Sequence, residues 1–228
     1  GSVTNLKNLV NNSGVVAADV TGVGTARERL AAASYGTGLA IFAHGTTGSA
    51  TAISNLVNTS GVIASDVSGV GTARFGLAAS SFGGDKAIFG YGRPGSGNSS
   101  LTNLVSNVGV LSSDVTGVGT ARRDIAAASY GGDKGVFGYG ISGSSSNVTN
   151  KVSNVGVVAT DTTGVGSARY YLAATGYGGD KAIFGFGSTG SVTGITNLVN
   201  NSGSVAADVS AVGTAREKPA AAGYSISA

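Results

Sequence analysis

An aspartate and, eight residues after it, an arginine recur five times along this chain of 228 residues. The aspartates are Asp19, Asp66, Asp114, Asp161 and Asp208, and the arginines are Arg27, Arg74, Arg122, Arg169 and Arg216. Both series advance in steps of 47, 48, 47 and 47 residues. A fixed period of roughly 20–50 residues is typical of solenoids, propellers and arrays, because one such unit cannot bury its apolar side chains without neighbours. The sequence therefore predicts one repeat domain over 1–228, with copies at about 1–45, 46–92, 93–140, 141–187 and 188–228.

Each copy contains four short segments with the character of strands. In the fourth copy they are the later part of 141–154, then 155–162, 168–178 and 181–187, and glycine, asparagine and serine separate them. Gly178-Gly179-Asp180 supplies the positive φ angles of a tight hairpin. Four strands in a unit of about 47 residues match a propeller blade. We predict an all-β fold, a closed five-bladed β-propeller whose chain ends meet in one blade; the alternative is an open β-solenoid or fibre segment.

The composition agrees with a folded domain that has many turns. The chain has 40 glycines, 41% hydrophobic residues and only 11% charged residues, against a usual charged share of roughly 25%, and this apolar content argues against disorder. There is no cysteine, so no disulfide or thiolate is available. The basic residues behind the net charge of +3 are scattered, which argues against a nucleic-acid groove. No apolar run reaches the roughly 20 residues of a transmembrane helix, so we expect no membrane insertion.

The fifth copy differs from the others in two ways. It stops at Ala228, before any counterpart of 181–187, and it carries Pro219 at a place occupied elsewhere by leucine or isoleucine. Proline lacks the backbone donor that a central strand needs. We therefore expect this last strand to meet a neighbour on one side only or to bend. The protein is then either a monomer or a self-association that completes a blade.

The motif Arg-x-x-Leu-Ala-Ala-Ala, followed by a turn and by Ile-Phe-Gly-aromatic-Gly, resembles the kelch-type propeller repeat. The chain departs from that pattern because it has no tryptophan, and Phe-Gly-Tyr-Gly stands in for an adjacent glycine pair. Its Gly-Asp-Lys-Ala-Ile-Phe-Gly-Tyr-Gly wording also resembles repeats of marine bacteriophage structural and tail-associated proteins, which implies a virion or extracellular location. The kelch resemblance implies that the alanine-rich segments line the central channel. These segments are 31–33, 78–79, 126–128, 173–174 and 220–222.

The repeated aspartates and arginines are interpreted as structural ion pairs. A charged residue repeated in every copy most simply ties adjacent strands or blades through charge-assisted hydrogen bonds. The alternative is a polyvalent binding site formed by a ring of such charges. Calcium needs several converging oxygen ligands, whereas each loop offers one carboxylate. We therefore predict neither a metal site nor a cofactor.

Three aromatic residues flanked by glycines are the predicted ligand-binding positions. Tyr91, Tyr139 and Phe186 stand beside the variable loops, which we expect on one face, and we predict that their rings form an exposed platform. His44 occupies the same place in the first copy, either as part of this platform or as a substituted aromatic. The predicted function is a non-catalytic adhesion or recognition module for a glycan or a cell-surface receptor. The alternative is a purely structural propeller without a ligand. An enzyme is not predicted, because no pairing of nucleophile and base and no metal constellation is visible.

Overall fold

The computed structural model describes residues 2–223, and within them the fold is all-β, as predicted, with twelve strands and no helix. The strands form four antiparallel sheets of three strands each. The first sheet comprises β1 (Ala31–Tyr35), β2 (Leu39–Ala43) and β3 (Ser54–Val57); the second, β4 (Ala78–Phe82), β5 (Lys86–Gly90) and β6 (Thr102–Val105); the third, β7 (Ala126–Tyr130), β8 (Lys134–Gly138) and β9 (Thr149–Val152); the fourth, β10 (Ala173–Tyr177), β11 (Lys181–Gly185) and β12 (Thr196–Val199). Within residues 2–223, no helix is long and apolar enough to cross a membrane.

The first two strands of every sheet form the predicted hairpin. Tyr177 pairs with Lys181 across the turn in the fourth sheet, and Gly178 and Gly179 adopt φ angles of 59° and 80°. Residues with a Cβ disfavour this left-handed conformation, whereas glycine adopts it readily. The Gly-Gly-Asp sequence therefore fixes the register of the second, third and fourth hairpins, and Gly36-Thr37-Gly38 does so in the first.

The outermost predicted segment of each copy lies beside the third strand without forming a continuous ladder. In the third sheet, only isolated bridges connect β9 to it, at Val152–Val158 and Thr149–Thr162. Between these bridges the Asn150 side chain crosses the gap, and its Nδ2 donates to the Ala159 carbonyl at 3.1 Å. A side-chain amide thus replaces part of the backbone ladder. In the second to fourth copies the four expected segments are present, but the segment equivalent to 155–162 is irregular.

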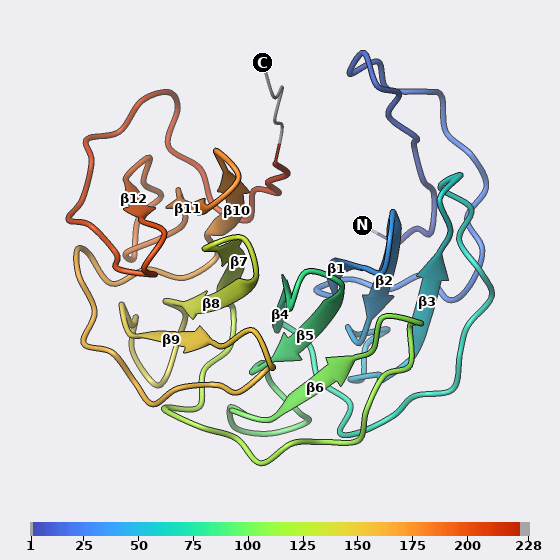
Figure 1. The fold of residues 1–228 in the computed structure, drawn as a ribbon, viewed down its shortest axis with the longest axis horizontal. Coiled ribbons are helices and arrows are strands. Elements are labelled where there is room, and N and C mark those ends of the chain that lie inside the picture. Colours follow the sequence, from blue (N-terminus) through green and yellow to red (C-terminus); the bar gives the residue numbers. More distant parts are fainter. Residues whose placement is uncertain (1, 224–228) are drawn as a thin grey trace.

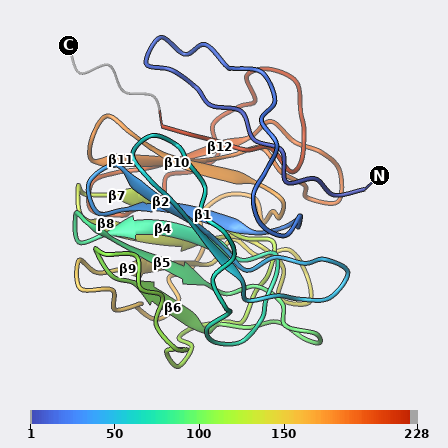
Figure 2. The ribbon, with the colours of Figure 1, turned by 90° about the vertical axis from the view of Figure 1, so that its right-hand side faces the viewer.

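The four sheets stand side by side around an arc, with β1, β4, β7 and β10 innermost (Figures 1 and 2). The first four alanine-rich segments therefore lie nearest the centre, as the kelch resemblance implies. Phe137, which is fully buried, fills the space between the second and third sheets. A Cβ at Gly90 would lie 2.7 Å from its ring, so only glycine allows the sheets to approach this closely. Phe184 lies against Gly138 in the same way at the next joint.

Sheets and sequence copies are out of phase. The first sheet takes β1 and β2 from the first copy and β3 from the second, so the expected boundary near residue 45 falls inside a sheet. Residues 5–20 consequently form an outer pair of segments with no inner strands, held by the bridges Lys7–Val20 and Val10–Val16. Residues 214–218 lie at the other end of the arc, and no strand forms among residues 214–223.

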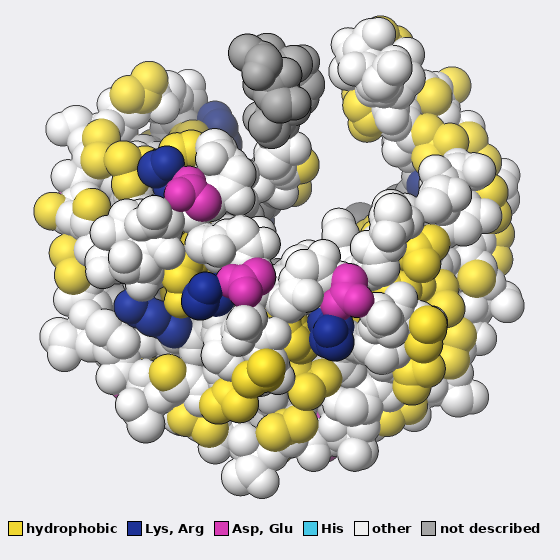
Figure 3. Space-filling model, viewed as in Figure 1, with side chains coloured by type: hydrophobic (Ala, Val, Ile, Leu, Met, Phe, Trp, Pro, Cys, Tyr) yellow, Lys and Arg dark blue, Asp and Glu magenta, His cyan; other side chains and the backbone are white. Residues whose placement is uncertain are grey.

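The arc is open between residues 5–20 and the fourth sheet (Figures 1 and 3). The repeat pattern predicts a closed ring of five blades, whereas residues 2–223 form four sheets that do not close into a ring. The physical reason lies in the phase of the copies, because the fifth unit is divided between the two ends of the chain. Pro219 belongs to no strand, in agreement with the backbone donor that it lacks.

Candidate functional site

A buried arginine joins the strands of each sheet. Arg122 is fully buried. Its Nε donates to the Tyr139 carbonyl at 2.9 Å, its Nη2 to Asn150 Oδ1 at 2.6 Å, and its Nη1 to the Thr120 carbonyl at 3.1 Å. Asp161 Oδ1 lies 3.7 Å from Nη1. One guanidinium thus contacts the inner, middle and outer parts of its sheet.

The aspartate paired with each arginine comes from the following copy. The pairs are Arg27–Asp66 at 3.8 Å, Arg74–Asp114 at 3.3 Å, Arg122–Asp161 at 3.7 Å and Arg169–Asp208 at 3.6 Å. Thr120 reinforces the third pair, since its backbone N–H and Oγ1 both donate to the Asp161 carboxylate. We call the set of threonine or serine, arginine, asparagine and aspartate a clamp. Burial alone would raise the pKa of Asp161, but hydrogen bonds from Thr120 and Asn150 outweigh it and lower that pKa.

The predicted ligand-binding aromatics lie inside the joints between sheets. We call His44, Tyr91, Tyr139 and Phe186 the buried set; their φ angles are 62°, 66°, 64° and 63°. Tyr139 is fully buried, packs on Phe184 with ring centroids 5.1 Å apart, and lies 4.6 Å below the Arg169 guanidinium. Tyr91 has the same surroundings, and burial raises the pKa of both tyrosines to about 12. The prediction of an exposed platform is therefore wrong for Tyr91 and Tyr139. Phe186, at the end of the arc, is half-buried.

His44 occupies the same buried place in the first joint. It is fully buried, and neither ring nitrogen has a hydrogen-bond partner among residues 2–223. Burial, together with the nearby Arg74, lowers the pKa of His44 to about 3, so the ring is neutral at pH 7. Its carbonyl accepts the Arg27 Nε hydrogen bond, as the Tyr139 carbonyl does for Arg122. His44 is therefore a substituted aromatic of the buried set.

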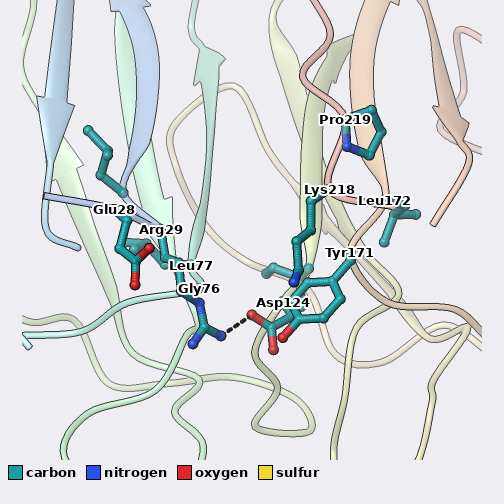
Figure 4. A pocket seen from close by; sticks show the side chains of 11 residues that line it. Glu28, Arg29, Gly76, Leu77, Asp124, Tyr171, Leu172, Lys218 and Pro219 are labelled. Carbon is teal, nitrogen blue, oxygen red and sulfur yellow. Dashed lines mark hydrogen bonds and ion pairs between the residues drawn. The ribbon is translucent and has the colours of Figure 1, made fainter. Parts of the chain in front are cut away.

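A second series of left-handed residues surrounds the centre of the arc. We call the residues two positions after the clamp arginines the funnel set: Arg29, Gly76, Asp124, Tyr171 and Lys218, with φ angles of 55°, 62°, 53°, 54° and 55°. Backbone hydrogen bonds join them in sequence. They run from Gly76 N to Arg29 O at 3.0 Å, from Asp124 N to Gly76 O at 2.7 Å, from Tyr171 N to Asp124 O at 3.2 Å and from Lys218 N to Tyr171 O at 2.8 Å. Four side chains and one glycine, each from a different copy, thus converge on one place (Figure 4).

The funnel set lines a cavity of about 540 Å³. Asp124 lies deepest, with only 2% of its side chain exposed. Arg29 Nη2 donates to its Oδ1 at 2.5 Å. Its Oδ2 lies 3.2 Å from Arg123 Nε but accepts no hydrogen bond from residues 2–223. A Cβ at Gly76 would lie 2.6 Å from Asp124 Oδ1, so a glycine is required where Arg29 crosses the second sheet to reach the third.

Tyr171 and Lys218 form the other wall of the cavity (Figure 4). Lys218 Nζ lies 4.5 Å from the centre of the Tyr171 ring, and Tyr170 contacts that ring edge-on at 4.9 Å. The Lys218 side chain is 63% exposed. The cavity therefore offers an aromatic face and an exposed cation, and at its base lies a carboxylate paired with two arginines.

The cavity opens on the face that carries the variable loops. Glu28 forms an isolated β-bridge with Thr46, and Arg123 forms one with Ile141. The residues beside the funnel set are thus joined through their backbones to the start of these loops. The hairpin turns lie on the opposite face, where adjacent Asp–Lys pairs are visible along the arc (Figure 3). These pairs are Asp85–Lys86, Asp133–Lys134 and Asp180–Lys181. The loops and the funnel set are thus neighbours on one surface.

The sequence pattern contains a signal for the funnel set. Most places in the unit repeat the same residue or a close relative, whereas the second residue after each repeated arginine differs from copy to copy. An arginine, a glycine, an aspartate, a tyrosine and a lysine at one place in a regular scaffold indicate that no single residue type is needed there for the fold.

Comparisons with known proteins do not identify a function for this chain, so its function is inferred from the geometry of the site. No family model matches this chain, and no curated protein matches it either. Within residues 2–223, no group of three or more histidine, aspartate or glutamate side chains is arranged to hold a metal ion.

Proposed function

We propose that this chain is a non-catalytic recognition module, built as a kelch-like β-propeller of five blades, which binds a glycan in the cavity of the funnel set. One observation carries the proposal. Four of the five funnel residues keep bulky or charged side chains in a left-handed backbone conformation that glycine adopts without strain. A virion or other extracellular location, implied by the bacteriophage resemblance, belongs to the same proposal.

The cost of this conformation needs a compensating benefit. A left-handed residue with a Cβ costs roughly 1–2 kcal/mol, and Gly76 shows that the same backbone position accepts glycine. Burial of large rings offsets the cost in the buried set. The exposed Lys218 and the half-buried Tyr171 gain much less from packing. Strain of this kind is typical of functional positions.

The chemistry of the cavity suits a sugar. The Tyr171 ring provides an apolar surface for the C–H face of a pyranose. The exposed Glu28 is an acceptor for a hydroxyl group, and Lys218 is a donor on the opposite wall. An apolar surface with a few convergent polar groups is the usual composition of a small-molecule site.

A glycan array followed by calorimetry with the best sugar tests this proposal. Tyr171→Ala should weaken binding at least tenfold, because the ring forms the stacking surface. Tyr177→Ala is the matched control, since Tyr177 is 37% exposed at the hairpin end of β10, and binding should stay within twofold. Equal losses in both variants, or a sugar that binds unchanged to Tyr171→Ala, would contradict a site in the funnel.

The second candidate is a purely structural propeller with no ligand. The contact between Arg29 and Asp124 favours it, because this ion pair ties the first sheet to the third. If no glycan on the array binds, and if Asp124→Asn lowers the stability of the protein, the structural role would be supported. Turnover of the bound sugar would instead contradict the non-catalytic proposal.

A further inference from the structure

The two ends of the arc carry complementary halves of a clamp. Asn8 Nδ2 donates to Asp19 Oδ1 at 2.8 Å and to the Ala17 carbonyl at 2.9 Å. Asn150 makes the same two bonds, to Asp161 and Ala159, in a complete clamp. At the other end, Arg216 Nη1 donates to the Thr214 carbonyl at 3.4 Å, as Arg122 does to Thr120.

The arginine half already sits as it would in a complete joint. Gly187 N donates to the Arg216 carbonyl at 2.9 Å, which repeats the bond from Gly140 N to the Arg169 carbonyl at 2.8 Å. The Arg216 guanidinium lies 3.9 Å from the centre of the Phe186 ring, as Arg169 lies over Tyr139. These contacts hold the Arg216 backbone and side chain against the fourth sheet.

The aspartate half is docked on the first sheet in an equally regular way. The Leu9 side chain lies over Gly61, as Leu104 lies over Gly156 between the second and third sheets. Lys7 Nζ adds a hydrogen bond to the Gly61 carbonyl at 3.2 Å. Residues 5–20 therefore hold the position of an outer blade edge relative to the first sheet.

In the open arc, each half lacks what the other provides. Within residues 2–223, no threonine, serine or arginine contacts Asp19, although each of the four clamp aspartates has an arginine and either a threonine or a serine. Arg216 is exposed, and its Nη2 has no asparagine partner among the described residues. The two halves carry opposite charges. Figure 1 shows residues 5–20 (blue) and the red C-terminal part facing each other across the opening.

We propose that these halves join within one molecule as a fifth clamp, in which Thr214 donates to Asp19 and Arg216 Nη2 donates to Asn8 Oδ1. This inference rests on the proposed five-bladed architecture and names the contacts that close it. The halves belong to one chain, and linked groups reach effective concentrations of about millimolar, which favours the same molecule over a second copy. Closure also brings Arg29 N towards the Lys218 carbonyl, the two open ends of the hydrogen-bonded funnel set.

Cysteine cross-linking tests this proposal cleanly because the chain has no cysteine. Asp19→Cys is combined with Thr214→Cys, and the product of mild oxidation is resolved on a non-reducing gel. The matched control combines Asp161→Cys with Thr120→Cys, where the native oxygens lie 2.6 Å apart in a complete clamp. The complete clamp calibrates the yield of the disulfide, because both pairs have the same geometry if the fifth clamp forms. We expect a cross-linked monomer for both pairs, formed to a similar extent.

Each other outcome overturns the inference. A covalent dimer of the 19/214 variant means that the halves join between molecules. Free thiols at 19 and 214, beside a cross-linked control, mean that the arc stays open. A double-mutant cycle with Asp19→Ala and Thr214→Ala is independent of disulfide geometry. The two changes should couple at least fivefold in the unfolding equilibrium constant, and independent effects exclude the clamp.

Sugar binding by the same variants separates closure from the proposed function. Retained binding in a variant that does not cross-link would overturn the fifth clamp while leaving the funnel site intact. Lost binding in a chain that closes normally would overturn the funnel site and leave the clamp.

Discussion

The buried set and the funnel set place side chains on the same left-handed backbone and use them in opposite ways. Members of the buried set are three aromatic residues and one histidine, and three of the four are fully sealed between sheets. Members of the funnel set are five different residues that line a cavity. In the buried set, packing offsets the strain and the residue type repeats. In the funnel set, packing offsets little of the strain and the residue type does not repeat. We infer that the strained conformation is retained there because these side chains bind a ligand.

The largest expected difference between the two sets is in stability. Tyr139→Ala should lower the free energy of unfolding by about 3–5 kcal/mol, because it removes a fully buried ring. Tyr171→Ala, at nearly the same φ angle, should lower it by less than about 1 kcal/mol, since the ring is half-buried. Chemical denaturation of the two variants provides the measurement. Similar losses would mean that the funnel set is also part of the core.

The histidine of the buried set should make stability depend on pH. The pKa of His44 is about 3 in the folded state, against its ordinary value of 6.5, because burial disfavours the charged ring. Its folded pKa is lowered, so the stability it contributes is complete above about pH 6.5 and is lost as the pH falls towards 3. Between pH 7 and pH 5 the free energy of unfolding should fall by about 2 kcal/mol.

His44→Tyr is the control for this pH dependence, because it restores the aromatic residue of the second and third joints. The charged groups near His44 are Arg74, Asp114 and Arg27. The pKa of Asp114 is lowered below its usual value of 3.8, so this carboxylate does not titrate between pH 7 and pH 5. The slope should disappear in His44→Tyr. A slope that persists would assign the titration to another group.

The glycine of the funnel set provides a sharper comparison. Gly76→Ala places a methyl group against Asp124 Oδ1 and also strains a φ angle of +62°. Gly84→Ala has the strain alone, at +79°, with nothing within 4 Å. Each substitution should cost roughly 1 kcal/mol for the backbone, and Gly76→Ala should cost about 1 kcal/mol more because Arg29 and Asp124 must separate. Equal unfolding midpoints of the two variants would show that the ion pair between Arg29 and Asp124 contributes nothing to the stability of the fold.

The smallest expected effect is a gain. Tyr171→Gly should be about 0.5–1 kcal/mol more stable than Tyr171→Ala, because glycine adopts the left-handed conformation without strain. At position 139, both Tyr139→Gly and Tyr139→Ala should remain far less stable than the unchanged protein, because relief of the backbone strain does not compensate for the lost buried ring. Thermal unfolding of the four variants side by side decides this. If Tyr171→Gly were the less stable variant, the proposed strain at the funnel would be wrong.

The sequence predicted the parts of this fold that depend on local chemistry. Gly178 and Gly179 specify a hairpin through their φ angles, and the alanine-rich strands are small enough to lie at the centre. The phase between copies and sheets was not predictable in this way, because a periodic pattern has the same period in every frame. Tyr91 shows a second limit. Its flanking glycines suggested exposure, whereas they permit the left-handed turn and the close approach of the next sheet.

The funnel set was missed for a related reason. Repetition draws attention to what each copy shares, and the shared charges of the clamps serve the scaffold. The residues with no shared identity needed the three-dimensional arrangement to bring Arg29, Asp124 and Lys218 around one cavity.

The offset between sheets and copies has a consequence for how such a gene can change. Every sheet joins inner strands encoded by one copy to an outer strand encoded by the next. An unequal recombination that inserts or deletes one copy therefore always reunites matching half-blades, whatever the point of exchange. The number of blades can change in single steps while every new junction repeats an existing one, so the coding unit can multiply without a poorly fitting intermediate.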